Sequence, residues 1–361
     1  MKHLPHLLAR MATAVALLAL PSCLDDDSLE EDDTFLGTFE ACWRAIDEHY
    51  CFFDEKNVDW DEVYTRYKPY FRDSVKTMVQ ELRLLDSMLD LLCDGHVNIY
   101  APFNTARYWA WYEDYPQNFD NNLLERHYLG TNYWTAAGFK YGLMPDSVGY
   151  IRYESFSVSP GETNLDYMLA ALNMAKGLII DVRDNGGGAL TNVPTIASRF
   201  GEADLTYGYL KHKTGKGHND FSTPEPIKLD SRSDGRIYWD AKTQPVVVLT
   251  NRSAYSATNI FVMAMKASDG IGGRKIKTIG DKTGGGSGMP FSTVLPNGWT
   301  LRFSACPMYD KNKKSVEGGI DPDFKVDMDS VSMTVNHKDD IIEAARTYIN
   351  ENTLKTYDEQ E

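Results

Sequence analysis

A strand, a turn and a helix follow one another closely between residues 246 and 265, and this unit constrains the fold more than any other feature. The apolar run VVVL at 246–249 predicts a strand that is buried on both faces. A short polar turn follows, and apolar residues at helical spacing over 256–265 predict a helix. A buried strand that leads directly into a helix is typical of layered α/β proteins.

Ser256 lies where this turn meets the first helical turn. The position offers unpaired backbone N–H groups and the positive end of the helix dipole. It therefore suits a nucleophile whose attack generates an oxyanion. Serine is also a favoured helix N-cap, and the stretch taken alone fits that structural role better. The choice depends on whether the chain supplies a base, an orienting group and an oxyanion hole.

The α/β pattern extends over the chain from residue 148 onward. We expect further strands at 148–153, 177–183, 237–240, 275–279, 290–295 and 299–305, and helices at 167–175, 190–199 and 338–349. Residues 35–95 instead carry apolar side chains at helical spacing, which predicts three helices, the second capped by Asp59 or Asp61 and the third at 75–92. The predicted fold class is α/β (α+β), a layered core preceded by a small N-terminal helical bundle.

Residues 101–142 are rich in aromatic side chains and show little periodicity. Two interpretations stay equally open for this segment. It is either an irregular packed connection or an aromatic wall or lid beside a cleft.

Residues 1–22 predict an export signal. Lys2 and Arg10 flank a basic start, and the apolar run at 11–20 is too short to span a bilayer. The sequence LPSC at 20–23 resembles a bacterial lipobox, which predicts lipidation of Cys23 and anchoring to a membrane through that residue. A plain signal peptide followed by a coincidental cysteine is the alternative.

Residues 23–34 predict a solvated acidic tether with no helical or strand pattern. The tether resembles the surface-export tags of some bacterial lipoproteins. We therefore expect a protein of the bacterial cell envelope, lipid-anchored to the outer membrane, and exposure at the cell surface is a further hypothesis. The formal net charge of −15 and the lack of a Lys/Arg-rich patch argue against a nucleic-acid partner.

Four cysteines follow Cys23, and the exported compartment permits disulfides between them: Cys42, Cys51, Cys93 and Cys306. Their pairing cannot be deduced from the sequence. None of them shows the spacing of a zinc site. The sequence predicts no metal and no cofactor, and it leaves the oligomeric state open.

A glycine-rich turn, RDNGGG at 183–188, follows a buried strand and precedes a predicted helix. Glycine allows positive φ and close backbone approach, so N–H groups can converge on an oxygen. The N–H of Gly186 or Gly187, together with that of Ala257, would form an oxyanion hole for acyl transfer. A simple tight turn is an equal alternative, whereas a phosphate site is disfavoured because the GxGxxG pattern and a Walker lysine are absent.

Two further residues are candidates for proton transfer. His96 lies between a predicted helix and a predicted strand, where a histidine can reach a cleft and act as general base. Glu317 would orient its imidazole if the carboxylate is buried. The alternatives are a surface histidine and an exposed loop acid. The DKTG sequence at 281–284 matches the phosphorylation motif of ion-pumping ATPases, but those pumps need many membrane spans, and the sequence has none.

Five segments occur in one order over about residues 35–330, and together they resemble the tricorn-core and C-terminal processing serine peptidases. The segments are LLCDGHV (91–97), GYIRYESFS (149–157), GLIIDVRDNGGG (177–188), VVVLTNRSAYSATNIF (246–261) with TIGDKTGGGSG (278–288), and EGGIDPDFKV (317–326). The resemblance implies a layered crotonase/ClpP-like peptidase core. It places the nucleophile at Ser256, not Ser253, and the oxyanion donors at Ala257 and at Gly186 or Gly187.

The resemblance also bears on the base. One branch of the family uses a Ser-Lys dyad, and its lysine position falls on Gly286 in this chain, while Lys282 precedes that position. The tricorn-like branch instead uses histidine and glutamate, which match His96 and Glu317. The tricorn protease has a serine just before its histidine, where this chain has Gly95, so Glu317 would act directly, through water or through another residue.

The sequence predicts six segments. They are an export signal (1–22), a tether (23–34), a helical bundle (35–96), an aromatic-rich connection (97–147), a serine peptidase core (148–350) and a tail (351–361). The connection is too short for the PDZ domain that processing members of the family often carry. We expect a lipid-anchored serine endopeptidase that acts on peptides or proteins. The alternative is a non-catalytic protein that binds a peptide or a lipophilic ligand, as the similar repeats of interphotoreceptor retinoid-binding protein bind lipophiles.

Overall fold

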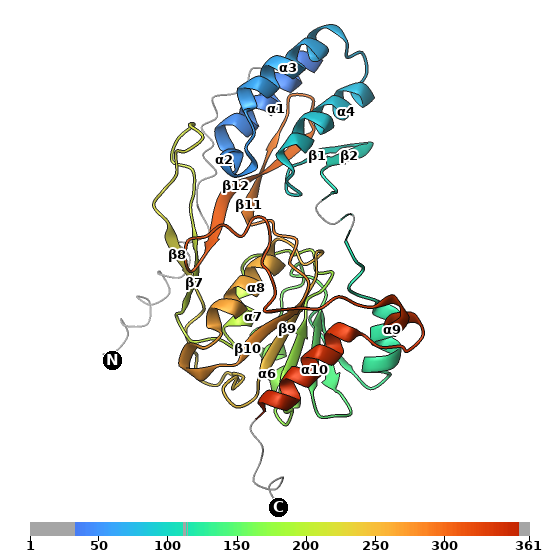
Figure 1. The fold of residues 1–361 in the computed structure, drawn as a ribbon. Coiled ribbons are helices and arrows are strands. Elements are labelled where there is room, and N and C mark those ends of the chain that lie inside the picture. The colour runs from blue at the N-terminus through green and yellow to red at the C-terminus, as the bar shows by residue number, and fades with distance from the viewer. Residues whose placement is uncertain (1–32, 111–112, 114, 354–361) are drawn as a thin grey trace, which may run out of the picture.

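The computed structural model describes residues 33–110, 113 and 115–353, which form two lobes (Figure 1). The predicted export signal, the lipidation site Cys23 and nearly all of the acidic tether lie outside the described residues, as does the end of the tail. Within the described ranges, no helix is both long and apolar enough to cross a membrane.

The upper lobe in Figure 1 packs N-terminal helices on a sheet. The helices are α1 (Phe35–His49), α2 (Phe53–Lys56), α3 (Trp60–Asp73) and α4 (Met78–Leu89), followed by the 3-10 turn η1 (Asp90–Leu92). Side chains cap the starts of α1, α3 and α4, because the oxygens of Thr34, Asp59 and Thr77 accept from N–H groups of the first turn. Asp59 is thus the cap of the second predicted helix.

Antiparallel pairs build the sheet of this lobe, in the order β2-β1-β12-β7-β8 with β11 also on β12. The strands are β1 (Asn98–Ala101), β2 (Asn104–Arg107), β7 (Thr206–Leu210), β8 (Glu225–Lys228), β11 (Gly288–Val294) and β12 (Thr300–Asp310). Strand β12 belongs to the C-terminal half of the chain and pairs with β1 from the N-terminal half. The predicted helical segment and the predicted core therefore share one sheet.

The lower lobe contains a second sheet, in the order β13-β10-β9-β6-β5-β4-β3. Its strands are β3 (Trp134–Ala136), β4 (Phe139–Leu143), β5 (Gly149–Tyr153), β6 (Leu178–Asp181), β9 (Val246–Thr250), β10 (Ile276–Gly280) and β13 (Phe324–Lys325). The pairs from β5 to β13 are parallel, whereas β3, β4 and β5 pair antiparallel. The predicted buried strand is β9, and it lies within this parallel part.

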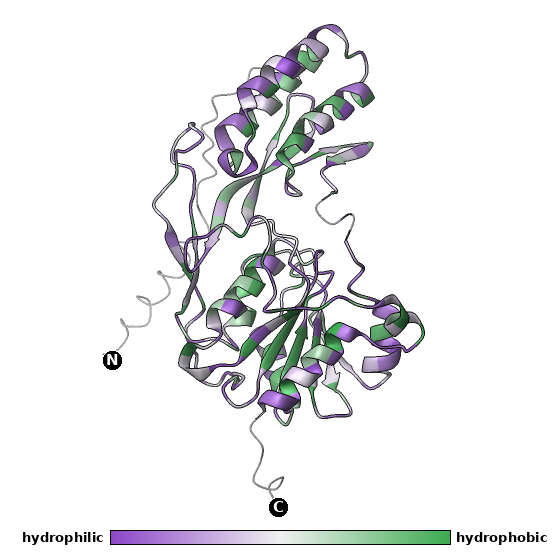
Figure 2. Cartoon of the chain, in the orientation of Figure 1, coloured by the Kyte–Doolittle hydropathy of each residue, from purple (hydrophilic) through white to green (hydrophobic). Residues whose placement is uncertain are grey.

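Alternating side chains of β9 enter two different cores, as the two-residue period of a strand requires. Val246 and Val248 pack with α6 (Glu162–Ala171), α7 (Asn192–Ala197) and α8 (Ala257–Ser268). Val247 and Leu249 face the opposite layer, which contains α10 (Asp340–Asn352). Figure 2 shows the resulting hydrophobic centre of the lower lobe. The α/β layering that the sequence predicts is confirmed.

Smaller elements complete the chain: α5 (Asn121–Leu123), η2 (Leu124–Leu129), η3 (Ile271–Gly273) and α9 (Ser330–Thr334). One predicted strand is wrong, because residues 237–240 form no strand. Their backbone is bound by loop contacts instead: the Ile237 N–H donates to Asp166 and the Trp239 N–H to the Arg199 carbonyl. Strands β2, β3, β4, β7, β8 and β13 were not predicted. The third N-terminal helix is shorter than expected, since it starts at Met78.

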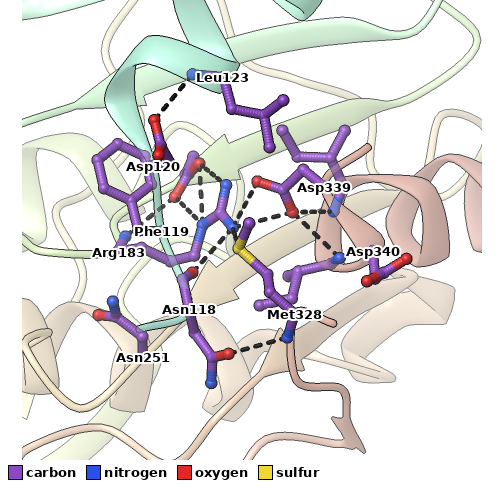
Figure 3. A network of polar contacts seen from close by, with 12 residues as sticks. Asn118, Phe119, Asp120, Leu123, Arg183, Asn251, Met328, Asp339 and Asp340 are labelled. Carbon is purple, nitrogen blue, oxygen red and sulfur yellow. Dashed lines mark hydrogen bonds and ion pairs between the residues drawn. The ribbon is translucent and has the colours of Figure 1, made fainter. Parts of the chain in front are cut away.

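A buried polar network holds the start of the glycine-rich turn (Figure 3). The fully buried Arg183 pairs with Asp181 at 2.6 Å and with Asp339 at 2.9 Å, and it donates to the Asn118 carbonyl at 3.0 Å. Its guanidinium also lies over the Phe119 ring, 5.1 Å from the centroid. Because these partners come from β6, from the cap of α10 and from the connecting segment, the network fixes the turn against three parts of the lower lobe.

Candidate active site

Ser256 does not cap the helix that it precedes. Helix α8 begins at Ala257, and the Ser256 side chain makes no capping hydrogen bond. Its backbone has φ 58° and ψ −124°, a conformation that a non-glycine residue adopts at a cost of about 1–3 kcal/mol. The Ser256 N–H donates to the Gly285 carbonyl at 2.8 Å, which holds this turn in place. The simple N-cap interpretation is wrong, and the hydroxyl is left available.

The structure brings His96 to this hydroxyl. The Nε2 atom of His96 lies 2.9 Å from Ser256 Oγ, although the two residues are 160 positions apart. His96 precedes β1 of the upper lobe and Ser256 precedes α8 of the lower lobe, so the site lies where the lobes meet (Figure 1). His96 is buried, at 3% exposure, and the interpretation as a surface histidine is therefore wrong.

Burial is the main influence on the charge of His96. It lowers the pKa of the imidazole to about 4, an effect that the Asp94 carboxylate opposes and that Arg302 and Arg107 reinforce. The ring is therefore neutral at pH 7, and a neutral imidazole can accept a proton from a hydroxyl. If Nε2 accepts from Ser256, the proton of the ring sits on Nδ1, and Nδ1 has no hydrogen-bond partner among the described residues.

Asp94 holds the backbone of the histidine. Its Oδ1 accepts from the His96 N–H at 2.8 Å, and its Oδ2 accepts from the Ser304 hydroxyl at 2.8 Å. The carboxylate is buried, at 1% exposure. Asp94 therefore places a fixed negative charge beside the imidazole. Asp94 was not predicted as a site residue, although it lies two residues before the candidate base His96 in the sequence.

Glu317 is buried as the resemblance requires, but it makes no hydrogen bond with His96. Its Oε2 accepts from the Ser287 N–H at 2.7 Å, and its Oε1 lies 3.3 Å from Lys56 Nζ. Burial and then the nearby Asp94 raise the pKa of Glu317 to about 8, while Lys56 acts in the opposite direction. Glu317 thus lies in a buried cluster with Lys56 and Asp94, and the interpretation as an exposed loop acid is wrong.

The glycine-rich turn approaches the serine closely. A Cβ on Gly187, at φ +96°, would lie 2.8 Å from the Ser256 Cβ and 2.9 Å from the Ala257 nitrogen, so only glycine allows this contact. The Gly187 N–H donates to the Asn185 side chain at 3.0 Å. The N–H groups of Gly186 and Ala257 make no hydrogen bond to any described residue. Of the two predicted glycines, Gly186 is the one with an available donor.

No lysine occupies the position of the dyad branch. A Cβ on Gly286 would lie 2.3 Å from the Tyr255 ring, which fills the space that a side chain there would need. Tyr255 also packs on His96, with ring centroids 4.9 Å apart. Among the described residues that line the cleft around Ser256, none is a lysine.

This cleft has a volume of about 430 Å³, and Ser256, His96 and the glycine-rich turn form part of its wall. Two arginines that were not predicted as site residues, Arg107 and Arg302, also line it. None of the described aromatic residues of segment 101–142 lines the cleft, so they do not form a wall there. Elsewhere in the described ranges, no group of three His, Cys, Asp or Glu side chains is arranged to hold a metal ion.

A serine hydroxyl beside a neutral histidine, next to N–H groups that bond to no described residue, defines the class of serine-type hydrolases. The chain belongs to peptidase family S41, whose model matches residues 147–326, and the model of the tricorn protease C1 domain matches residues 32–74. The predicted family is confirmed, and the chain is thereby placed with the serine-type peptidases.

Similar proteins agree with this assignment. A crystal structure of a proposed peptidase from Parabacteroides merdae is 48% identical, with a TM-score of 0.80, and the match covers 88% of this chain and 97% of that one. The carboxy-terminal processing protease CtpB of Bacillus subtilis is 32% identical over 124 residues, 33% of this chain and 22% of CtpB. A protein of Staphylococcus haemolyticus named as a CtpA-like serine protease is 25% identical, over 50% of this chain and 34% of that protein. The chain thus spans about a third or less of these two curated relatives.

Proposed function

We propose that this protein is a serine endopeptidase of the bacterial cell envelope, with Ser256 as nucleophile and His96 as general base. The observation that carries the proposal is the 2.9 Å contact between His96 Nε2 and a serine hydroxyl that caps no helix. A neutral base in hydrogen-bond reach of a hydroxyl at a helix start is the arrangement that activates a serine.

The reaction then follows from the positions of these groups. Ser256 Oγ attacks the peptide carbonyl carbon and passes its proton to His96 Nε2. The N–H groups of Gly186 and Ala257 would donate to the oxyanion. The intermediate collapses as His96 gives the proton to the leaving amine, which leaves an acyl-enzyme. Water then repeats the sequence, with His96 again taking and returning the proton, and releases the acid product.

The carboxylates have different proposed roles. Asp94 would stabilise the imidazolium that forms during the reaction, since its charge is the main influence that favours protonated His96. Glu317 would act indirectly, through the cluster that it shares with Lys56 and Asp94. This indirect role replaces the direct orientation of His96 by Glu317, since Glu317 bonds to Ser287 instead.

The lipid anchor is a separate part of the proposal. The lipobox-like sequence ending at Cys23 supports lipidation and retention at the outer membrane. In a bacterial host, the wild-type protein should take up labelled palmitate and fractionate with membranes. Cys23→Ser should abolish both, and a membrane-bound, unlabelled wild-type protein would contradict lipid anchoring.

The test of activity uses two neighbouring serines. Ser256→Ala should lower cleavage of a peptide library by at least about a thousandfold, because the nucleophile is lost. Ser253→Ala, in the same turn, should retain cleavage within a few fold. Equal activity of Ser256→Ala and wild type would refute the assignment. The alternative of a lipophile binder gains no support, since charged and polar residues make up much of the cleft wall.

A further inference from the structure

The strand register places two arginines on the same face of the sheet, one on each side of Asn98. Asn98 of β1 is directly opposite Arg107 of β2 and directly opposite Arg302 of β12. Residues that face each other across antiparallel strands project from the same side of the sheet, with Cβ atoms about 5 Å apart. Arg107, Asn98 and Arg302 therefore form one row across three strands, and all three line the cleft with Ser256 and His96.

The guanidiniums of this row form no ion pair with a described carboxylate, although the Asp86 carboxylate lies beside the Arg107 backbone N–H. Neither guanidinium lies within salt-bridge distance of an Asp or Glu in the described ranges, although the chain carries a net charge of −15. Arg107 lies over the Trp109 ring, 4.3 Å from the centroid, and its buried Nε atom has no described hydrogen-bond partner. Elsewhere in the protein, buried arginines such as Arg183 and Arg199 are paired with acids. The row thus presents two positive charges to whatever occupies the cleft.

These charges work against the proposed base. Arg302 and Arg107 both disfavour the protonated form of His96, which must form when Ser256 attacks. An anion bound between the guanidiniums would offset this effect. The arrangement is therefore unfavourable for a neutral substrate and favourable for one that brings its own negative charge.

We propose that Arg107 and Arg302 form a subsite for a carboxylate of the peptide substrate, close to the bond that Ser256 cleaves. The planar guanidinium binds carboxylates with two parallel hydrogen bonds, which gives both affinity and orientation. An acidic side chain and a free C-terminus present the same group. The proposal rests on the proposed peptidase function, and it names the class of substrate.

The test compares peptides that differ only in this group. A library in which each member exists with Glu or Gln at each position near the cleavage site, and with a free or amidated C-terminus, is incubated with the protein, and products are measured by mass spectrometry. We expect kcat/KM to be about tenfold or more higher for the carboxylate member, because a charged hydrogen bond is lost in the amide. A preference for Glu over Gln would identify an acidic side chain as the source of the bound carboxylate, and a preference for the free over the amidated terminus would identify the C-terminus.

Variants of the row give the second comparison. Arg107→Gln and Arg302→Gln should each reduce the preference to less than about threefold, whereas the lysine variants should retain part of it, since they keep the charge but lose the bidentate geometry. Arg66→Gln is the matched control, because Arg66 is an exposed arginine that lies over the Tyr67 ring. It should leave the preference unchanged.

A second assay, which needs no turnover, uses the same peptides as competitors of a fluorophosphonate probe that labels Ser256. Carboxylate members should slow labelling of Ser256 more than their amides. Equal protection and equal cleavage by acid and amide members, or a preference retained in both arginine variants, would overturn the subsite. If the subsite is overturned in this way but Ser256 is still labelled by the probe, the proposed peptidase function is unaffected. If Ser256 is not labelled at all, the proposed peptidase function itself is contradicted.

Discussion

The pH dependence of Ser256 reactivity follows from the burial of His96. Only neutral imidazole can accept the proton, and burial lowers the pKa of His96 to about 4 from its ordinary value of 6.5. At pH 5.5, roughly 97% of the imidazole would be neutral with the lowered value, compared with roughly 9% for an unperturbed histidine. The two cases differ about tenfold at this pH.

The assay is the rate of fluorophosphonate labelling between pH 4 and pH 8, with Ser256→Ala as the blank. We expect half of the maximal rate near pH 4, and half-loss near pH 6.5 would refute the argument from burial. Folding must be followed by circular dichroism at each pH. A lowered folded-state pKa of His96 means that the unfolded chain binds more protons below pH 6.5, so this group reduces stability as the pH falls from 6.5 to 4.

Three substitutions test the packing and charge around the site. Gly286→Ala places a Cβ 2.3 Å from the Tyr255 ring and should lower the free energy of unfolding, measured in urea, by about 3 kcal/mol. In the control Gly298→Ala the Cβ meets nothing within 4 Å, so this variant should lose only about 1 kcal/mol because of its positive φ. Equal losses in the two variants would contradict the packing argument. Asp94→Asn removes the charge that favours the protonated base, so kcat/KM should fall about tenfold, or ~1.4 kcal/mol, and an unchanged rate would argue against this role. Arg183→Met leaves buried acids unpaired and should cost about 3–5 kcal/mol in the same urea assay; wild-type stability would contradict the network.

Local patterns predicted much of the lower lobe. The apolar run of β9 and the periodic segment of α8 indicate strand and helix because each lies within one short window of sequence. The segment 237–240 shows the limit of this reasoning. Trp239 of this segment is buried and Ile237 is exposed, but no described strand pairs with the segment, and pairing is not visible in a single segment.

The site depends more strongly on contacts between distant segments. The resemblance to a family brought His96 and Ser256 together as a hypothesis, since the two residues are 160 positions apart. The row of Arg107 and Arg302 arises from strand register across β2, β1 and β12, which no local pattern reveals. Likewise, the hydrogen bond from Ser287 to Glu317 depends on how two glycine-rich loops pack.

The central claim is that His96 activates Ser256, and site-resolved fluorophosphonate labelling tests it most directly. The wild-type protein should carry the probe on Ser256, identified by mass spectrometry of the digested protein. His96→Ala should slow this labelling by at least about a hundredfold, because general-base catalysis contributes about that much or more. The control His212→Ala, at an exposed histidine, should label at the wild-type rate. Labelling at another residue, or an unchanged rate in His96→Ala, would contradict the account.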